Sequence, residues 1–256
     1  MRFAGVVQGA AFVTALCAGI LTGCSAQPYE GAANEGAAKE KVLLMTSLPL
    51  IWGEGASMED VLAGNAAPAA IYKAWQERYE IEAVDSFEGL EASDADIVIL
   101  AQPRAMAPAD LASFDEWVRA GGRALILTDP MLVWPSELAL GDKRRPLATG
   151  LLSPLLKHWG IEMLAPDEDS AGGVAMGFDD YDVQTAGVGT FAKLAPNGEC
   201  KLINKDVMAR CRIGEGQAIV VADADFLNQE LWGDEAPNKS GAVRLTDNLL
   251  KEMSVK

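Results

Sequence analysis

The stretch Ala120–Pro130, AGGRALILTDP, decides the fold. Its segment Arg123–Thr128 is apolar without alternation, which is typical of a strand covered on both faces in a parallel sheet. The glycines at 121–122 precede this strand, and glycine readily adopts the left-handed conformation that ends a helix. Asp129 follows the strand directly. Because open α/β sheets bind ligands beyond the carboxyl ends of their strands, Asp129 is the first candidate site residue.

The residues before this stretch predict an amphipathic helix over Pro108–Ala120. Apolar side chains recur there at spacings of three and four, at Leu111, Phe114, Trp117 and Val118. Proline is tolerated in a first helical turn, where its missing N–H is not needed. A helix followed at once by a buried strand is one half of a β-α-β unit.

Similar apolar runs on either side predict further strands and helices. The strands are expected at Lys41–Thr46, Glu80–Val84, Asp96–Ala101 and Gln217–Ala222, and the helices at Pro68–Tyr79, Ser153–Trp159 and Leu245–Met253. Long loops are expected at Ser47–Asn65 and after Asp129, and short β segments within Val174–Leu194. This alternation predicts an α/β fold with a doubly wound, mostly parallel sheet and right-handed crossovers.

The beginning of the chain predicts export. Residues 1–23 contain one arginine, an apolar run and small residues, as a signal peptide does. The sequence Leu21-Thr22-Gly23-Cys24 resembles the bacterial lipobox, which implies cleavage before Cys24 and acylation of that residue. The alternative is an ordinary signal peptide with an incidental cysteine. With acylation, the protein would be anchored in the cell envelope facing the periplasm, and Ser25 favours the outer membrane.

Composition predicts a tether, then a single folded domain. Residues 24–40 are rich in Gly, Ala and Glu without apolar periodicity, as in a flexible tether, and 41–256 are expected to form one α/β domain. The 256-residue chain has a formal net charge of −16. Nucleic-acid binding needs a basic face, so this charge argues against a nucleic-acid partner.

Two cysteines flank an expected hairpin late in the chain. Cys200 and Cys211 border Lys201–Arg210, which is expected to form two short strands with a turn near residues 204–206. In an exported protein a disulfide between them is favoured over two free thiols. A metal pair is less favoured because no histidine or further cysteine lies near them in the sequence.

Four stretches together resemble a known family. They are FDEWVRAGGRALILTDP (114–130), LLSPLLKHWGIEM (151–163), GEGQAIVVADADFLNQELW (214–232) and LTDNLLKEM (245–253). They resemble the extracytoplasmic domain of the gliding-motility-type ABC-transporter auxiliary family. The resemblance implies a flavodoxin-like fold close to that of class I glutamine amidotransferases, and ABC-transporter subunits as partners. It implies no catalytic residues. Members of that family are often held by transmembrane helices, whereas this sequence has a lipobox and no later apolar span.

Covalent catalysis is not expected from these residues. No G-x-S-x-G or comparable cysteine elbow is present, and the one histidine, His158, sits in a predicted helix beside Trp159. We expect His158 to be a surface or packing residue. No cofactor is expected either.

Three acidic residues are expected at the carboxyl edge of the sheet. Asp129, Asp223 and Asp225 each follow a core strand. They could bind Mg²⁺ or Ca²⁺, or act as an acid/base pair in an envelope hydrolase. The favoured interpretation is that they accept hydrogen bonds from backbone N–H groups of the next turn.

Two tryptophans are predicted to overhang the same edge. Trp52 lies six residues after Thr46, and Trp134 lies six after Thr128. With Glu54, Gln102 and Arg104 they would form an apolar cleft with a few polar groups, the usual form of a ligand site. The alternatives are that the tryptophans cover the core and that Arg104 forms a surface salt bridge.

The function expected from these features is that of a non-enzymatic, lipid-anchored envelope protein. It would be an accessory or a ligand- or partner-binding component of an ABC-type transport system. The alternative is the hydrolase, possibly metal-assisted, that uses the three aspartates.

Overall fold

A computed structural model describes residues 38–166, 173–178, 181–194, 199–234 and 236–254. The predicted signal peptide, Cys24 and the tether up to residue 37 lie outside the described residues. Within the described ranges, none of the helices combines the length and the apolar character that a membrane crossing requires.

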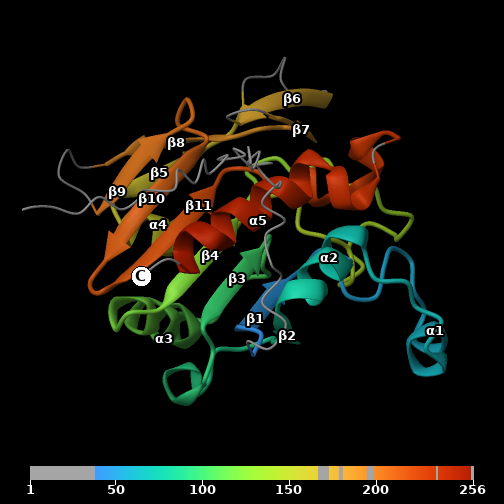
Figure 1. Cartoon of the computed structure of the whole chain (residues 1–256), viewed down its shortest axis with the longest axis horizontal. Helices are drawn as coiled ribbons and strands as arrows, with labels where there is room; N and C mark the ends of the chain where they lie inside the picture. The colour runs from blue at the N-terminus through green and yellow to red at the C-terminus, as the bar shows by residue number, and fades with distance from the viewer. Residues whose placement is uncertain (1–37, 167–172, 179–180, 195–198, 235, 255–256) are drawn as a thin grey trace, which may run out of the picture. The chain divides into compact units, whose positions relative to one another are not determined.

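A seven-stranded sheet forms the centre of the described domain (Figure 1). Its strands are β2 (Glu80–Ala83), β1 (Lys41–Thr46), β3 (Ile97–Ala101), β4 (Arg123–Leu127), β11 (Gly216–Val221), β10 (Met208–Ile213) and β9 (Cys200–Ile203), in that order. The first five are parallel to one another, and β10 and β9 add an antiparallel edge. The predicted α/β class and the mostly parallel sheet are therefore confirmed.

Helices cover both faces of this sheet. On one face, α2 (Ala70–Arg78) and α5 (Gly241–Ser254) pack against the strands, and α5 lies across the sheet in Figure 1. On the other face, α3 (Pro108–Arg119) and α4 (Ser153–His158) enclose a second hydrophobic cluster.

Strand β3 shows why the central strands are apolar throughout. All five of its residues are buried. Ile97 and Ile99 belong to the cluster under α2 and α5, whereas Val98 and Leu100 belong to the cluster under α3 and α4. Side chains alternate across a strand, so a strand covered on both faces needs apolar residues at every position.

The glycine pair at the end of α3 serves two purposes. Gly121 has a φ of 117°, in the region that side chains disfavour, as predicted for the residue that ends a helix. Gly122 does not have a positive φ, so the predicted left-handed conformation is wrong there. A Cβ at Gly122 would overlap the ring of Trp117, so this glycine allows close packing of helix and strand.

Two predicted boundaries are wrong for local reasons. The expected loop Ser47–Asn65 contains a short helix, α1 (Met58–Ala63), which begins at a capping box between Ser57 and Asp60. The closing helix begins at Gly241 rather than Leu245, because the Ser240 hydroxyl accepts a hydrogen bond from the Val243 N–H at 3.3 Å.

The remaining strands form antiparallel pairs outside the central sheet. Strand β5 (Ile161–Leu164) pairs with β8 (Thr190–Lys193), and β6 (Gly173–Phe178) pairs with β7 (Tyr181–Ala186). The predicted late hairpin is formed by β9 and β10 and extends the central sheet at its edge.

A disulfide closes this late hairpin. Cys200 and Cys211 lie opposite each other in the register of β9 and β10, with their Cα atoms 3.9 Å apart, and are joined by a disulfide. The turn between the strands contains three residues with positive φ, at Asn204, Lys205 and Asp206, where the sequence predicts it.

We expect loss of this disulfide to destabilise the domain. The double variant Cys200→Ala/Cys211→Ala should lower the free energy of unfolding by about 3 kcal/mol, because the unfolded chain regains the freedom of a short closed loop. Urea unfolding of the full chain measures the change. Wild type kept reduced with a phosphine should match the variant, and identical unfolding midpoints for oxidised wild type and variant would contradict the expectation.

Candidate functional site

Two neighbouring parallel strands bring the three predicted aspartates to one edge of the sheet. Leu127 at the end of β4 pairs with Val221 at the end of β11. Asp129 follows β4 by two residues, and Asp223 and Asp225 follow β11. All three side chains are buried, with at most 1% of each residue exposed.

Two of these carboxylates hold the same pair of loops together. Asp129 accepts hydrogen bonds from Met131 N–H on its own loop, at 2.7 Å, and from Ala224 N–H beyond β11, at 3.1 Å. Asp225 accepts a hydrogen bond from Val133 N–H at 2.8 Å. Here the loop after β4 supplies the donor and the segment after β11 supplies the acceptor. The loop after β4 is therefore tied to the segment after β11 at two points.

The third carboxylate ties the site to the outer hairpin. Both oxygens of Asp223 lie within 2.8 Å of the Thr185 hydroxyl on β7, which donates to them. Asp223 also accepts a hydrogen bond from Phe226 N–H at 3.3 Å. All three aspartates thus accept hydrogen bonds from backbone N–H groups, which is the interpretation that the sequence favoured.

Burial raises the pKa of all three carboxyl groups. Loss of hydration is the largest cause in each case, because it penalises the charged form. The pKa of Asp129 rises to about 7, with the nearby charge of Asp225 as the second cause, and the pKa of Asp225 rises to about 6. The pKa of Asp223 is raised well above its ordinary value by burial and by the charge of Asp129.

Gln102 holds the loop after β4 in place at the same edge of the sheet. It follows β3 with a φ of 42°, and its side-chain oxygen accepts a hydrogen bond from Asp129 N–H at 2.8 Å. Its amide group donates to the carbonyl oxygens of Asp129 and Leu147, at 3.2 and 2.9 Å. Gln102 is fully buried, so the structure places it in the support of the loop after β4 and not on a cleft surface.

The structure offers little support for a metal at this edge. Within the described ranges, no group of three or more His, Cys, Asp or Glu side chains is arranged to hold a metal ion. The three aspartates direct their oxygens at N–H and hydroxyl donors of the chain itself. The geometry of the three aspartates therefore does not support the metal site that the alternative hydrolase function would use.

A cleft of about 540 Å³ lies beside the buried aspartates. One wall is the loop after β1 together with α2, a second is the loop after β4, and a third is the segment after β11. Asp129 and Asp225 tie the second wall to the third through the hydrogen bonds described above. Gln229 joins the third wall to the first, because its side-chain oxygen accepts a hydrogen bond from Ala70 N–H at 3.1 Å.

The cleft contains only part of the residue set predicted for it. Glu54 and Trp134 line it as predicted. Trp52 does not line it and is 53% exposed, and Arg104 is also exposed and outside the cleft lining. Among the described residues Arg104 makes no ion pair, so the surface salt bridge considered for it is absent there.

Sequence reasoning missed several cleft residues on α2 and on the third wall. Lys73 and Glu77 lie on α2, and Gln229 and Glu230 lie in a 3₁₀ turn. The sequence signal available for the turn was its position just beyond the last parallel strand. For α2, the polar positions of an amphipathic helix predict exposure but not a cleft.

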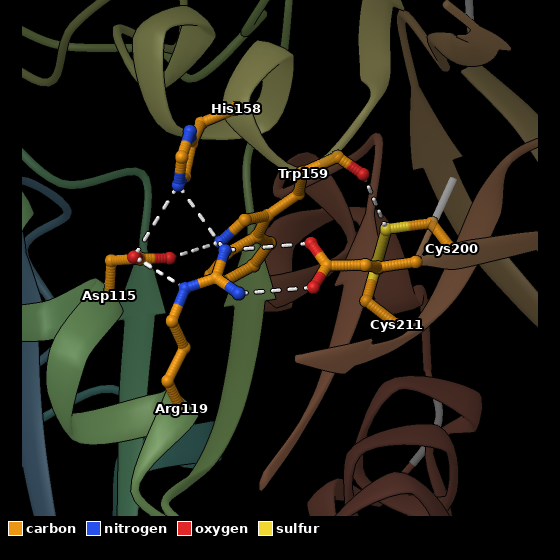
Figure 2. Close-up of polar contacts among 7 residues, drawn as sticks. Asp115, Arg119, His158, Trp159, Cys200 and Cys211 are labelled. Atoms are coloured by element: carbon orange, nitrogen blue, oxygen red, sulfur yellow. Dashed lines mark hydrogen bonds and ion pairs between the residues drawn. A yellow bond between two sulfur atoms is a disulfide. The ribbon is translucent and has the colours of Figure 1, made fainter. Parts of the chain in front are cut away.

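A second polar cluster contains the histidine (Figure 2). Arg119 on α3 donates to Asp115 at 2.8 Å and to Glu199 at 3.0 Å, and the Trp159 indole donates to Asp115 at 2.6 Å. The His158 ring lies 3.2 Å from Arg119, and its side chain is 61% exposed. This cluster joins α3, α4 and the start of the disulfide hairpin, and His158 is a surface residue as expected.

We expect the buried aspartates to make the folded state less stable as the pH rises. A carboxylate whose pKa is lowered by folding has the opposite effect. A carboxyl group with a raised pKa in the folded state favours folding below its unfolded pKa of about 4, and this contribution is lost as the pH rises through 6 to 7. Asp225→Asn keeps an oxygen for Val133 N–H but removes the charge. Relative to wild type, its free energy of unfolding should increase by about 1 kcal/mol from pH 5 to pH 8.

Urea titrations at pH 5, 6, 7 and 8 measure this difference. The matched control is Asp85→Asn, which removes an exposed carboxylate and should leave the pH profile parallel to that of wild type. A constant difference between Asp225→Asn and wild type across this range would show that Asp225 titrates as an ordinary aspartate.

The chain aligns with several solved structures. The chain aligns with the structure titled "mmIFT52 N-terminal domain" at 12% identity, covering 85% of this chain and 98% of that one, with a TM-score of 0.50. It aligns with an exo-beta-1,4-mannosidase from Opitutaceae bacterium strain TAV5 at 12% identity, covering 83% and 36%, with a TM-score of 0.49. A cytoplasmic protein from Salmonella typhimurium LT2, STM1381, aligns at 10% identity, covering 83% and 99%, with a TM-score of 0.48. At these identities the likeness concerns the fold alone.

The sequence itself matches a family. No curated protein matches it, but the family model described as "ABC-type uncharacterized transport system" matches residues 39–166. This half of the chain contains β1 to β5, the loop that carries Trp134, and the wall formed by α2. The chain therefore belongs to this auxiliary family of ABC-type transport systems, as the resemblance in its sequence implied.

Proposed function

We propose that this protein is a lipid-anchored accessory component of an ABC-type transport system. Its folded domain faces the periplasm and binds a ligand or partner without catalysing a reaction. The family match over residues 39–166 carries this proposal. The lipobox at 21–24 supports the anchor, and Ser25 supports sorting to the outer membrane.

The binding site in this proposal is the cleft at the carboxyl edge of the sheet. Ligand sites of open α/β sheets are commonly found at this edge, and 540 Å³ is within the usual range for a small-molecule site. We also assign the fold to the flavodoxin-like class. The order β2-β1-β3-β4-β11 supports this, because it follows the 2-1-3-4-5 order of that class.

We expect the full-length protein, purified from its native membrane, to carry ATPase and permease subunits of a transporter with it. Mass spectrometry identifies the co-purified proteins. If recognition uses the cleft, Trp134→Ala should reduce their recovery at least tenfold, because it removes the aromatic wall. Trp52→Ala is the matched control, since it removes an exposed tryptophan outside the cleft. A melting curve establishes that each variant is folded.

Purification of the wild-type protein without transporter subunits would count against the accessory role. Equal recovery with both tryptophan variants would keep that role but move the contact surface away from the cleft.

We expect acylation at Cys24 alone. Cells grown with labelled palmitate should label wild type, and Cys24→Ser should abolish the label because it removes the thiol that is acylated. Cys17→Ser is the matched control, since it changes a cysteine that would be lost with the signal peptide. A wild-type protein that takes up no label, or a Cys24→Ser protein that keeps it, would reject the lipid anchor.

A further inference from the structure

The charges around the cleft are unbalanced. Four glutamates line it, at positions 54, 77, 137 and 230, together with one basic residue, Lys73. Among the described residues, none of these five side chains forms an ion pair or a hydrogen bond. The cleft therefore presents a net charge of about −3 that the protein itself does not neutralise.

Some acidic residues elsewhere on the domain form ion pairs. Asp142 pairs with Arg144 at 2.7 Å, Glu162 pairs with Lys157 at 2.8 Å, and Arg210 pairs with Glu252 at 2.7 Å.

The cleft also offers an apolar and aromatic surface beneath these charges. Trp134 is partly buried, packs against the core cluster and also lines the cleft. Its indole N–H makes no hydrogen bond among the described residues, so it remains available as a donor. The cleft is further lined by Pro49, Pro68 and Pro135 and by small residues of α2. An indole face attracts cations, and proline and alanine surfaces favour an apolar body.

We infer that the cleft binds a small organic cation, in which one or more ammonium or guanidinium groups are carried on an apolar skeleton. Its positive groups would meet the glutamates at the rim, and its skeleton would lie against Trp134 and the prolines. A cavity of 540 Å³ holds a molecule of this kind, whereas a carboxylate or phosphate ligand would meet three uncompensated negative charges. This inference rests on the proposed use of the cleft as the binding site.

Three octane derivatives of equal length test the charge preference. Isothermal titration calorimetry on the full-length protein in a neutral detergent compares 1,8-diaminooctane, 1,8-octanediol and octanedioate. The diamine should bind at least tenfold more tightly than the diol, and octanedioate should not bind. The affinity for the diamine should fall with added salt, because rim charges are screened. Equal binding of diamine and diol, or no binding of the diamine at millimolar concentration, would overturn the inference.

Variants at the rim locate the site. Glu54→Gln/Glu137→Gln removes two exposed charges on two different walls and should weaken diamine binding at least tenfold. The control variant Glu91→Gln, an exposed acid outside the cleft, should bind as wild type does. Diamine binding that is unchanged in the double variant would place the cation elsewhere and overturn the inference.

Three further outcomes distinguish the failure of this inference from the failure of the proposed function. If a lysine-rich peptide binds and the diamine does not, the occupant is a protein segment and the small-cation inference is wrong. If the diamine fails to bind while transporter subunits still co-purify, the ligand class is wrong and the accessory role stands. If the diamine binds at the rim but no subunit co-purifies, the cation site stands and the accessory role fails.

Discussion

The burial of three carboxylates at one edge of the sheet is the constraint on which the site depends. A buried carboxylate is costly unless hydrogen-bond donors surround it, and here the donors are N–H groups of the adjoining loops and one hydroxyl. Those loops in turn would leave N–H groups unsatisfied without the carboxylates. Asp129 and Asp225 therefore fix the second and third walls of the cleft relative to each other, although neither side chain lines the cleft.

The sheet and the edge at which the three aspartates meet could be predicted from the sequence because both depend on local patterns. Unbroken apolar runs such as Ile97–Ala101 mark strands that are buried on both faces, and the acids that follow β4 and β11 must lie at one edge when those strands are parallel. The favoured role of the aspartates, as acceptors for backbone N–H groups, followed from the same reasoning. This prediction required only that each aspartate be followed in the sequence by a turn.

The cleft could be predicted only in part, because its walls come from segments far apart in the sequence. Trp52 and Trp134 have equal spacings from their strands, yet only Trp134 lines the cleft. The loop that carries Trp52 contains helix α1, which begins at a capping box at Ser57, whereas the loop between β4 and α4 contains no helix, so the two loops differ in shape. Gln229 and Ala70 are 159 positions apart in the chain and are joined by a hydrogen bond. No periodic sequence pattern predicts such a contact.

Two sets of acidic residues at this edge of the sheet have different physical consequences. The buried aspartates exchange hydration for hydrogen bonds from fixed donors, and their charge is partly suppressed because burial raises their pKa. The exposed glutamates at the rim keep their hydration and have no basic partner among the described residues, so their charge remains available. A rim charge interacts with a ligand across water and is worth little by itself, but several such charges around one aromatic surface act on the same molecule. The hydrogen bonds of Asp129 and Asp225 join the two walls that carry Glu137 and Glu230, so the buried acids support the proposed binding surface without lining it.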